Sequence, residues 1–255
     1  MNHIFIVAKY TFIDVYRSKV MNSLFFLAAG LVALTYVASE FAYGAPAKIA
    51  LDFGFGITSI INIMLAIFIG ANILSKEIEQ KTLYMIISRK ISRSSFLIGK
   101  ILGLSSVLLI NSITMGMLSI FIYVFLGGVF QGLMIWAIVF SLTEALIILL
   151  FSVLFSLVTN STMAIIYSVG LFIVGHALNE TSKIFIVKTN MFFKYVIELS
   201  FFLVPSLYKL NLKDFLLYKQ SIDLNYLLGI QFYSISYMCA LTIFISLIFK
   251  NKNLD

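Results

Sequence analysis

Charged residues and cysteine are scarce in this sequence of 255 residues. Asp, Glu, Lys and Arg make up 11% of the chain, whereas 61% of the residues are hydrophobic. So little charge cannot cover the surface of a water-soluble globule, and the composition therefore predicts a protein that lives in a lipid bilayer. The single cysteine, Cys239, excludes an internal disulfide, and no Cys/His spacing typical of a zinc site occurs.

Sequence motifs for nucleotide binding and for hydrolysis are missing as well. Gly99-Lys100 lacks both the upstream glycine and the following hydroxyl of a Gly-x-x-x-x-Gly-Lys-Ser/Thr phosphate loop. The chain contains no His-Glu-x-x-His and no Gly-x-Ser-x-Gly, which argues against an intramembrane hydrolase. We therefore expect no enzyme, no catalytic residue, and no metal or cofactor bound by this chain.

The formal net charge of +7 does not indicate nucleic-acid binding. The basic residues cluster at the ends of apolar runs. Membrane orientation and anionic lipid headgroups account for basic residues at such places, so the lipid bilayer is the expected partner and nucleic acid is not.

Long apolar runs divide the chain into six predicted transmembrane helices. A helix needs about 20 mainly apolar residues to cross the bilayer. The predicted spans are 20–37, 53–74, 96–126, 133–158, 163–178 and 224–249. The predicted fold class is therefore an all-α polytopic membrane protein, in which residues 1–255 form a single transmembrane domain.

A helix lying on the membrane surface is expected before the first span. Within residues 1–19, the side chains of Phe5, Ala8, Phe12 and Tyr16 fall on one side of a helix, and the charged residues lie elsewhere. This pattern is typical of an interfacial helix.

The segment 179–225, between the fifth and sixth spans, is predicted to lie on the outer side. It is rich in lysine but balanced by acids, and its part 191–204 is apolar. That part carries Lys194 and Glu198 one turn apart and ends at Pro205, which favours a re-entrant or surface-lying helix over a further span.

The distribution of basic residues predicts the orientation. Every arginine falls in the predicted inner segments, and the short outer turns hold only Lys48. Because cytoplasmic loops carry an excess of Lys and Arg, both termini are expected in the cytoplasm.

The stretch 75–95, between the second and third spans, mixes charges, hydroxyls and apolar side chains. Glu77 and Lys81 stand one turn apart, while Leu83 and Ile86 recur on one helix face. The pattern predicts a short amphipathic cytoplasmic helix that offers one side to a soluble partner. After it, Ser92 or Ser94 is expected to cap the next helix.

This stretch resembles the cytoplasmic coupling segment of ABC-2-type permeases, the membrane subunits of ATP-driven exporters. The family has an acidic pair followed by Thr and an apolar residue, a Pro-Ile/Val-Ser-Arg corner, and a Gly-Lys that opens the next span. The matching residues are Glu77, Glu79, Thr82, Leu83, Ile91, Ser92, Arg93, Gly99 and Lys100. Lys90 stands where the family usually has proline. The Glu-x-Glu-x-basic-Thr variant is similar to a branch that includes permeases of copper and nitrous-oxide-reductase maturation systems.

The resemblance implies a permease of the cytoplasmic (inner) membrane of a prokaryote that exports its substrate. It implies a separate ABC ATPase subunit that binds ATP and Mg²⁺, and a second permease copy in a homodimer. The residues that it assigns to ATPase coupling are Glu77, Glu79, Thr82, Leu83, Ile86, Ser92, Arg93 and Lys100. Lipid, peptide, drug, glycan and copper-maturation cargo all remain open. The alternative is a stand-alone secondary transporter or a membrane assembly or scaffold protein.

Glu144 lies well inside the fourth predicted span. A charged group at the centre of a membrane helix costs roughly 2.5–3.5 kcal/mol, so its carboxyl should face protein or water. Either it lines a substrate pathway, with Asn62 and Asn111, or it is a buried acid that is protonated or hydrogen-bonded to a polar side chain of another span, such as Asn62, Asn72 or Asn111. A copper site formed by His176 with Met115 and Met117 is not supported by their spacing.

Small residues recur on the third predicted span. Two pairs of small residues stand four positions apart, Gly99 with Gly103 and Ser112 with Gly116. Such residues let two helices approach closely, so we expect packing contacts there.

Overall fold

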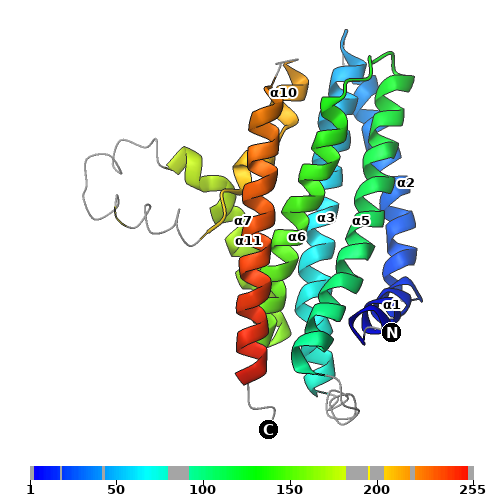
Figure 1. Cartoon of the computed structure of the whole chain (residues 1–255). Coiled ribbons are helices and arrows are strands. Elements are labelled where there is room, and N and C mark those ends of the chain that lie inside the picture. Colours follow the sequence, from blue (N-terminus) through cyan, green and yellow to red (C-terminus); the bar gives the residue numbers. More distant parts are fainter. Residues whose placement is uncertain are drawn as a thin grey trace.

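The computed structural model describes residues 3–17, 19–41, 44–79, 92–181, 195, 204–218 and 222–251. Within these ranges all regular structure is helical, and no strand occurs. The helices are α1 (His3–Arg17), α2 (Lys19–Glu40), α3 (Pro46–Glu79), α5 (Arg93–Phe125), α6 (Leu133–Val158), α7 (Ser161–Thr181), η1 (Leu207–Leu210), α10 (Lys213–Leu217) and α11 (Leu224–Asn251). Figure 1 shows the long helices side by side in one bundle, with α1 lying across its lower end.

Five of the described helices are long and apolar enough to cross a membrane. They span 46–72, 93–125, 133–158, 161–178 and 224–251. They correspond to the second to sixth predicted spans, and α6 begins and ends at the predicted residues. In α2 the apolar stretch found among the described side chains, Phe26–Glu40, is shorter than a span. The all-helical polytopic fold is confirmed, and the count of six spans stays a prediction.

The helix α3 ends later than predicted. A break was expected after Leu74, but α3 continues to Glu79. Residues 75–79 contain no glycine or proline and include Lys and Glu, which favour helix, so the helix extends past the apolar run. The predicted amphipathic helix after it falls mainly on residues 80–91, outside the described residues. The predicted re-entrant helix 191–204 also lies outside them, apart from Tyr195 and Val204.

The middle of the bundle is formed by α3 and α6. In α6, 67% of the apolar stretch is buried, against 17% of that in α11. The main hydrophobic cluster joins Ala66 and Ile67 of α3 to Leu108 of α5 and Ile147 of α6. Lipid solvates apolar side chains as well as a protein core does, so α11 needs little burial inside one chain.

Two glycines of α5, Gly99 and Gly103, allow α1 to pack closely against this helix. A Cβ atom added at Gly99 would lie 2.7 Å from Cβ of Val7, and one added at Gly103 would lie 2.7 Å from the carbonyl oxygen of Ala8. Further along α5, a Cβ at Gly116 would lie 2.6 Å from Cγ1 of Ile138 in α6. The predicted close packing at these small residues is therefore confirmed.

The predicted apolar side of α1 differs from the side that is buried against the bundle, and the location of α1 at the membrane surface stays a prediction. Thr11 and Val15 are its buried residues, whereas Phe5 is 71% exposed and Tyr16 is also exposed. The side chains that formed the predicted apolar stripe therefore lie partly away from the bundle. A helix on a membrane surface can turn one apolar side to protein and another to lipid, and the stripe alone does not distinguish the two.

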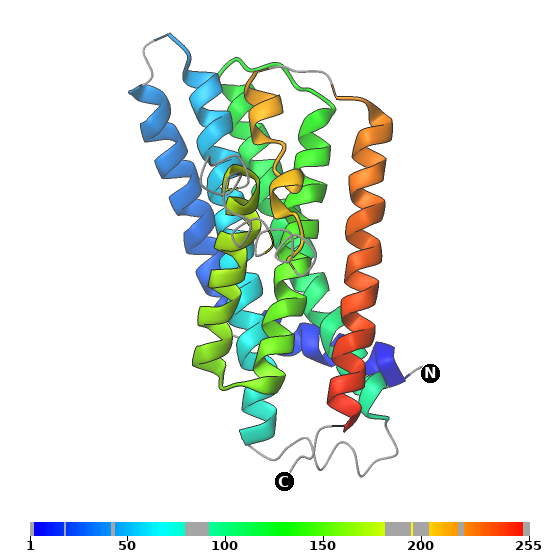
Figure 2. The same cartoon turned by 90° about the vertical axis from the view of Figure 1, so that its left-hand side faces the viewer.

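The start of α5 and the end of α11 lie at the same end of the bundle. Nη1 of Arg93 donates a hydrogen bond to the carbonyl oxygen of Lys250, 3.3 Å away. Figure 2 shows α1 and the ends of α3 and α11 at this same lower end. At the opposite end, Gly127 has φ of +88° and closes the turn after α5, as its Gly-Gly sequence predicts.

Candidate functional site

A polar pocket opens between α3, α6, α7 and the segment around η1 and α10. Its volume is about 270 Å³. The residues that line it are Phe55, Gly56, Ser59, Ile60, Ala137, Ser141, Glu144, Phe172, His176, Leu210, Asn211, Leu212 and Lys213. The pocket thus brings a carboxyl, an imidazole, an ammonium and several hydroxyls together on apolar helices.

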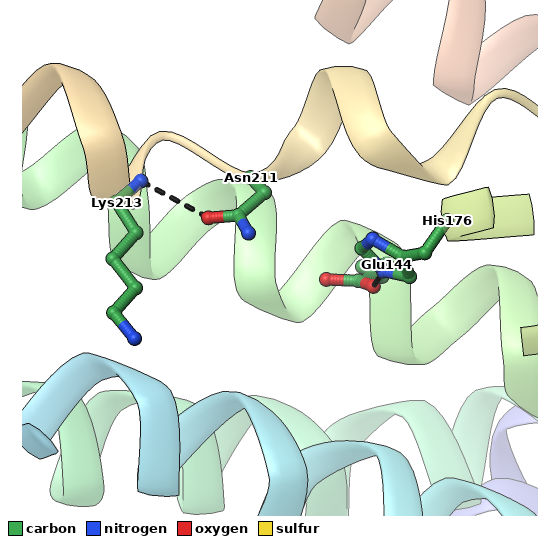
Figure 3. A network of polar contacts seen from close by, with 4 residues as sticks. All are labelled: Glu144, His176, Asn211 and Lys213. Atoms are coloured by element: carbon green, nitrogen blue, oxygen red, sulfur yellow. Dashed lines mark hydrogen bonds and ion pairs between the residues drawn. The ribbon is translucent and has the colours of Figure 1, made fainter. Parts of the chain in front are cut away.

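Glu144 of α6 contacts His176 of α7 inside this pocket (Figure 3). The distance between Oε1 of Glu144 and Nε2 of His176 is 2.6 Å, and their side chains are 3% and 29% exposed. The ring of Phe172 packs edge-on against the His176 ring, with centroids 4.8 Å apart. A buried carboxyl is stable only with a partner, and the imidazole supplies it.

His176 was not among the residues named as partners of Glu144. A hydrogen bond to a polar side chain of another span was one of the two alternatives, and the structure supplies it from His176 and not from an asparagine. These two residues are 32 positions apart in the chain, and they meet because α6 and α7 are antiparallel neighbours. The one indication of such a partner in the sequence was His176, which lies near the end of the predicted span 163–178.

A second pair of opposite charges, Lys213 and Asp52, lies at one side of the pocket. Nζ of Lys213, at the start of α10, lies 2.6 Å from Oδ1 of Asp52 in α3. The backbone N–H of Lys213 also donates to Oδ1 of Asn211, which holds the start of α10 (Figure 3). A Cβ at Gly56 would lie 3.1 Å from Nζ of Lys213, so the glycine leaves room for the ammonium. Neither residue lies in a sequence motif that indicates this pairing.

A buried chain of hydrogen bonds joins α5 and α3 to the pocket wall. Nδ2 of Asn111 donates to Oδ1 of Asn62 over 2.6 Å, and Nδ2 of Asn62 donates to the hydroxyl of Ser141 over 3.0 Å. Ser141 lines the pocket one turn before Glu144. The two predicted pathway asparagines therefore meet each other and reach the pocket through Ser141.

The comparison with protein families agrees with this architecture. The sequence matches the family described as ABC-2 family transporter protein over residues 4–218. The chain belongs to this family. No curated protein sequence matches it. The family match includes α1, α10 and every residue that lines the pocket, and it confirms the resemblance found in the coupling stretch.

As a member of the ABC-2 family, the chain is a membrane component of transport and is not itself catalytic. The family's coupling residues are only partly described by the structure. Glu77 and Glu79 lie in the last turns of α3, and Thr82, Leu83 and Ile86 lie outside the described residues. The predicted capping role of Ser92 is confirmed, because its hydroxyl accepts from the N–H of Ser95 over 3.2 Å.

The other two residues that were predicted to couple this ABC-2 chain to an ATPase lie at the start of α5. Arg93 is the first residue of the helix and reaches the carbonyl of Lys250, as described above. Nζ of Lys100 lies 5.6 Å from the centre of the Phe96 ring, one turn earlier in α5. Both side chains thus sit at the end of the bundle that also holds the last turn of α3.

Proposed function

We propose that this chain is the permease subunit of an ABC-2-type exporter. The observation that carries the proposal is the family match, which covers the membrane helices from α2 to α7 and every residue that lines the pocket in one continuous stretch. The pocket, with Glu144 and the hydrogen-bonded chain of Asn62 and Asn111, is the proposed part of the substrate pathway.

A separate ABC ATPase supplies the energy in this proposal, with ATP and Mg²⁺ bound to that subunit. It docks at the end of the bundle where α3 finishes with Glu77 and Glu79 and where α5 begins. Two observations favour this end. It carries acidic residues in a helix that extends beyond the apolar run, and the Arg93 contact ties the start of α5 to the end of α11.

The proposed assembly contains a second copy of the permease. The apolar stretches of α7 and α11 are only 22% and 17% buried within one chain. Their remaining faces are available to lipid and to the second copy. The proposed location is the cytoplasmic membrane of a prokaryote, with both termini in the cytoplasm.

One observation favours a second candidate function. A stand-alone secondary transporter needs ionisable groups within the membrane, and Glu144 with His176 is such a pair. This candidate predicts transport in liposomes that contain the permease alone. The exporter predicts that transport and ATP hydrolysis require both subunits.

The test combines purification with a charge reversal. The chain is tagged and co-expressed with a candidate ABC ATPase from the same genome, and ATP turnover of the purified complex is measured in liposomes. Glu79→Lys should leave the permease inserted but lower ATPase recovery or ATP turnover severalfold, because charges at the rim of an interface steer docking. Glu40→Lys, at the exposed end of α2, is the matched control. Recovery and turnover equal to those of the wild type in Glu79→Lys would contradict the proposed docking end.

A further inference from the structure

We propose that the pocket beside Glu144 binds a small organic ammonium ion, and that the Glu144 carboxylate recognises its charge. The ligand class is a primary amine in its protonated form, attached to a short apolar body. That such an amine is transported cargo rests on the proposed permease function, whereas its binding to the pocket does not.

The charges of the pocket favour a cation. Lys213 lies 2.6 Å from Asp52, so these two charges compensate each other. Glu144 has His176 as its partner and is the acidic residue in the lining of the pocket, where the hydroxyls of Ser59 and Ser141 carry no charge. A ligand with a single positive charge can therefore pair with the Glu144 carboxylate.

The geometry of Glu144 leaves an acceptor for the ligand. Among the described residues, its hydrogen bond to His176 uses Oε1. Figure 3 shows the second carboxylate oxygen directed away from the His176 ring. Ser141 and Ser59 contribute hydroxyls to the same pocket, and a primary ammonium has three N–H donors to share among such acceptors.

The walls and size of the pocket suit a small amine with an apolar body. Phe55 and Phe172 line it, and aromatic rings attract a cation as well as apolar groups. A volume of about 270 Å³ lies near the small end of the range for ligand pockets. A metal ion fits less well, since the described residues contain no group of three His, Cys, Asp or Glu side chains.

An ammonium of this kind has two sources, a free amine or the ethanolamine headgroup of a lipid. Both present the same charge and the same donors to Glu144. If the lipid headgroup is the ligand, lipid in the surrounding bilayer competes with a soluble amine for the pocket. If the free amine is the ligand, the lipid does not compete.

The experiment measures binding of benzylamine to the purified permease in phosphatidylcholine liposomes by calorimetry. Protein-free liposomes correct for partition into lipid. Benzylamine should bind about tenfold or more tightly than benzyl alcohol, which has a similar shape but no charge, since a hydrogen bond to a charged group is worth more than a neutral one. Equal affinity for the two compounds would overturn the proposal.

Two variants locate the site. Glu144→Gln should weaken benzylamine binding about tenfold or more, while Glu40→Gln, at an exposed carboxyl outside the pocket, should not. Unchanged benzylamine affinity in a folded Glu144→Gln protein would also overturn the proposal. If the Glu144→Gln protein does not insert into the membrane, the comparison of benzylamine with benzyl alcohol on the wild-type protein tests the proposal by itself.

A final arm separates the sources of the amine. Replacing part of the phosphatidylcholine with phosphatidylethanolamine should weaken benzylamine binding if the lipid headgroup occupies the pocket, and should leave it unchanged if the ligand is a soluble amine. Both outcomes retain the ammonium class. The permease is used without an ATPase, so failure of ATPase coupling would not affect the binding result.

Discussion

At the residue scale, the polar side chains between the inner helices form specific pairs. Asn62 is fully buried, and it both accepts from Asn111 and donates to Ser141. Thr58 and Ser119 form another pair between α3 and α5, with their hydroxyl oxygens 3.0 Å apart. In a membrane, where apolar packing alone distinguishes poorly between neighbours, such bonds help to fix which helix faces which.

The first prediction concerns the bond between Asn62 and Asn111. Asn62→Leu should lower the free energy of unfolding by about 0.5–2 kcal/mol, because the buried amide of Asn111 loses its acceptor. Asn111→Leu should have a similar effect. Unfolding of the purified protein in mixed micelles, with rising dodecyl sulfate and helix content as the readout, gives these values.

The double variant is the control. Since both substitutions remove the same bond, Asn62→Leu with Asn111→Leu should destabilise by less than the sum of the single effects. Strict additivity would show that the two amides do not stabilise the bundle through each other.

At the scale of the helix, the crossing of α1 over α5 is the least expected contact. Gly99 and Gly103 follow directly after the coupling stretch, and the backbone of α1 lies against both. A helix at the membrane surface is thereby attached to the start of a membrane span. Any movement of the coupling stretch that shifts α5 should therefore also move α1.

The second prediction tests this crossing. Gly103→Ala places a Cβ 2.7 Å from the Ala8 carbonyl oxygen and should destabilise the protein by about 1–3 kcal/mol through overpacking. Gly229→Ala in α11 meets no atom within 4 Å and should be neutral or stabilising by up to about 1 kcal/mol, since alanine favours helix. Thermal unfolding of both variants gives the comparison. A Gly103→Ala protein as stable as Gly229→Ala would mean that α1 is held loosely.

The sequence predicted some helices closely and their contacts poorly. The bounds of α6 were predicted because a long apolar run, with Glu144 as its only charged residue, lies between Gly132 and Thr159. The residues by which α1 packs on the bundle could not be predicted, because both lipid and protein accept its apolar side chains. The partner of Glu144 was missed for a different reason, since a contact between two helices leaves no trace in the periodicity of either.

At the scale of the whole molecule, the two ends of the bundle differ in how their cations are held. Arg17 ends α1, and Arg93 and Lys250 lie at the same lower end. At the other end, Lys213 is paired with Asp52, and Nζ of Lys48 lies 5.0 Å from the centre of the Tyr218 ring. Lys213 and Lys48 at the upper end thus have an acid and an aromatic ring, respectively, as a partner within the fold.

The arginines support a definite orientation. Basic residues near span ends are retained on the cytoplasmic side, and both arginines that the structure describes, Arg17 and Arg93, lie at the lower end. The end with Arg17 and Arg93 should therefore face the cytoplasm, and the end with Lys48 should face outward. Lysines that are compensated inside the fold explain how the outward end can contain several cations.

The last prediction tests this orientation by cysteine labelling in a Cys239→Ser background. Lys48 and Asn251 are both exposed, so a cysteine at either position is accessible to a reagent on its own side. A membrane-impermeant maleimide added to intact cells should label Lys48→Cys at once, and Asn251→Cys only after the membrane is permeabilised. The two variants control for each other, because each must react in permeabilised cells. Labelling of Asn251→Cys in intact cells, with Lys48→Cys protected, would reverse the orientation and move the proposed ATPase docking end to the outside, where no ATP is available to drive export.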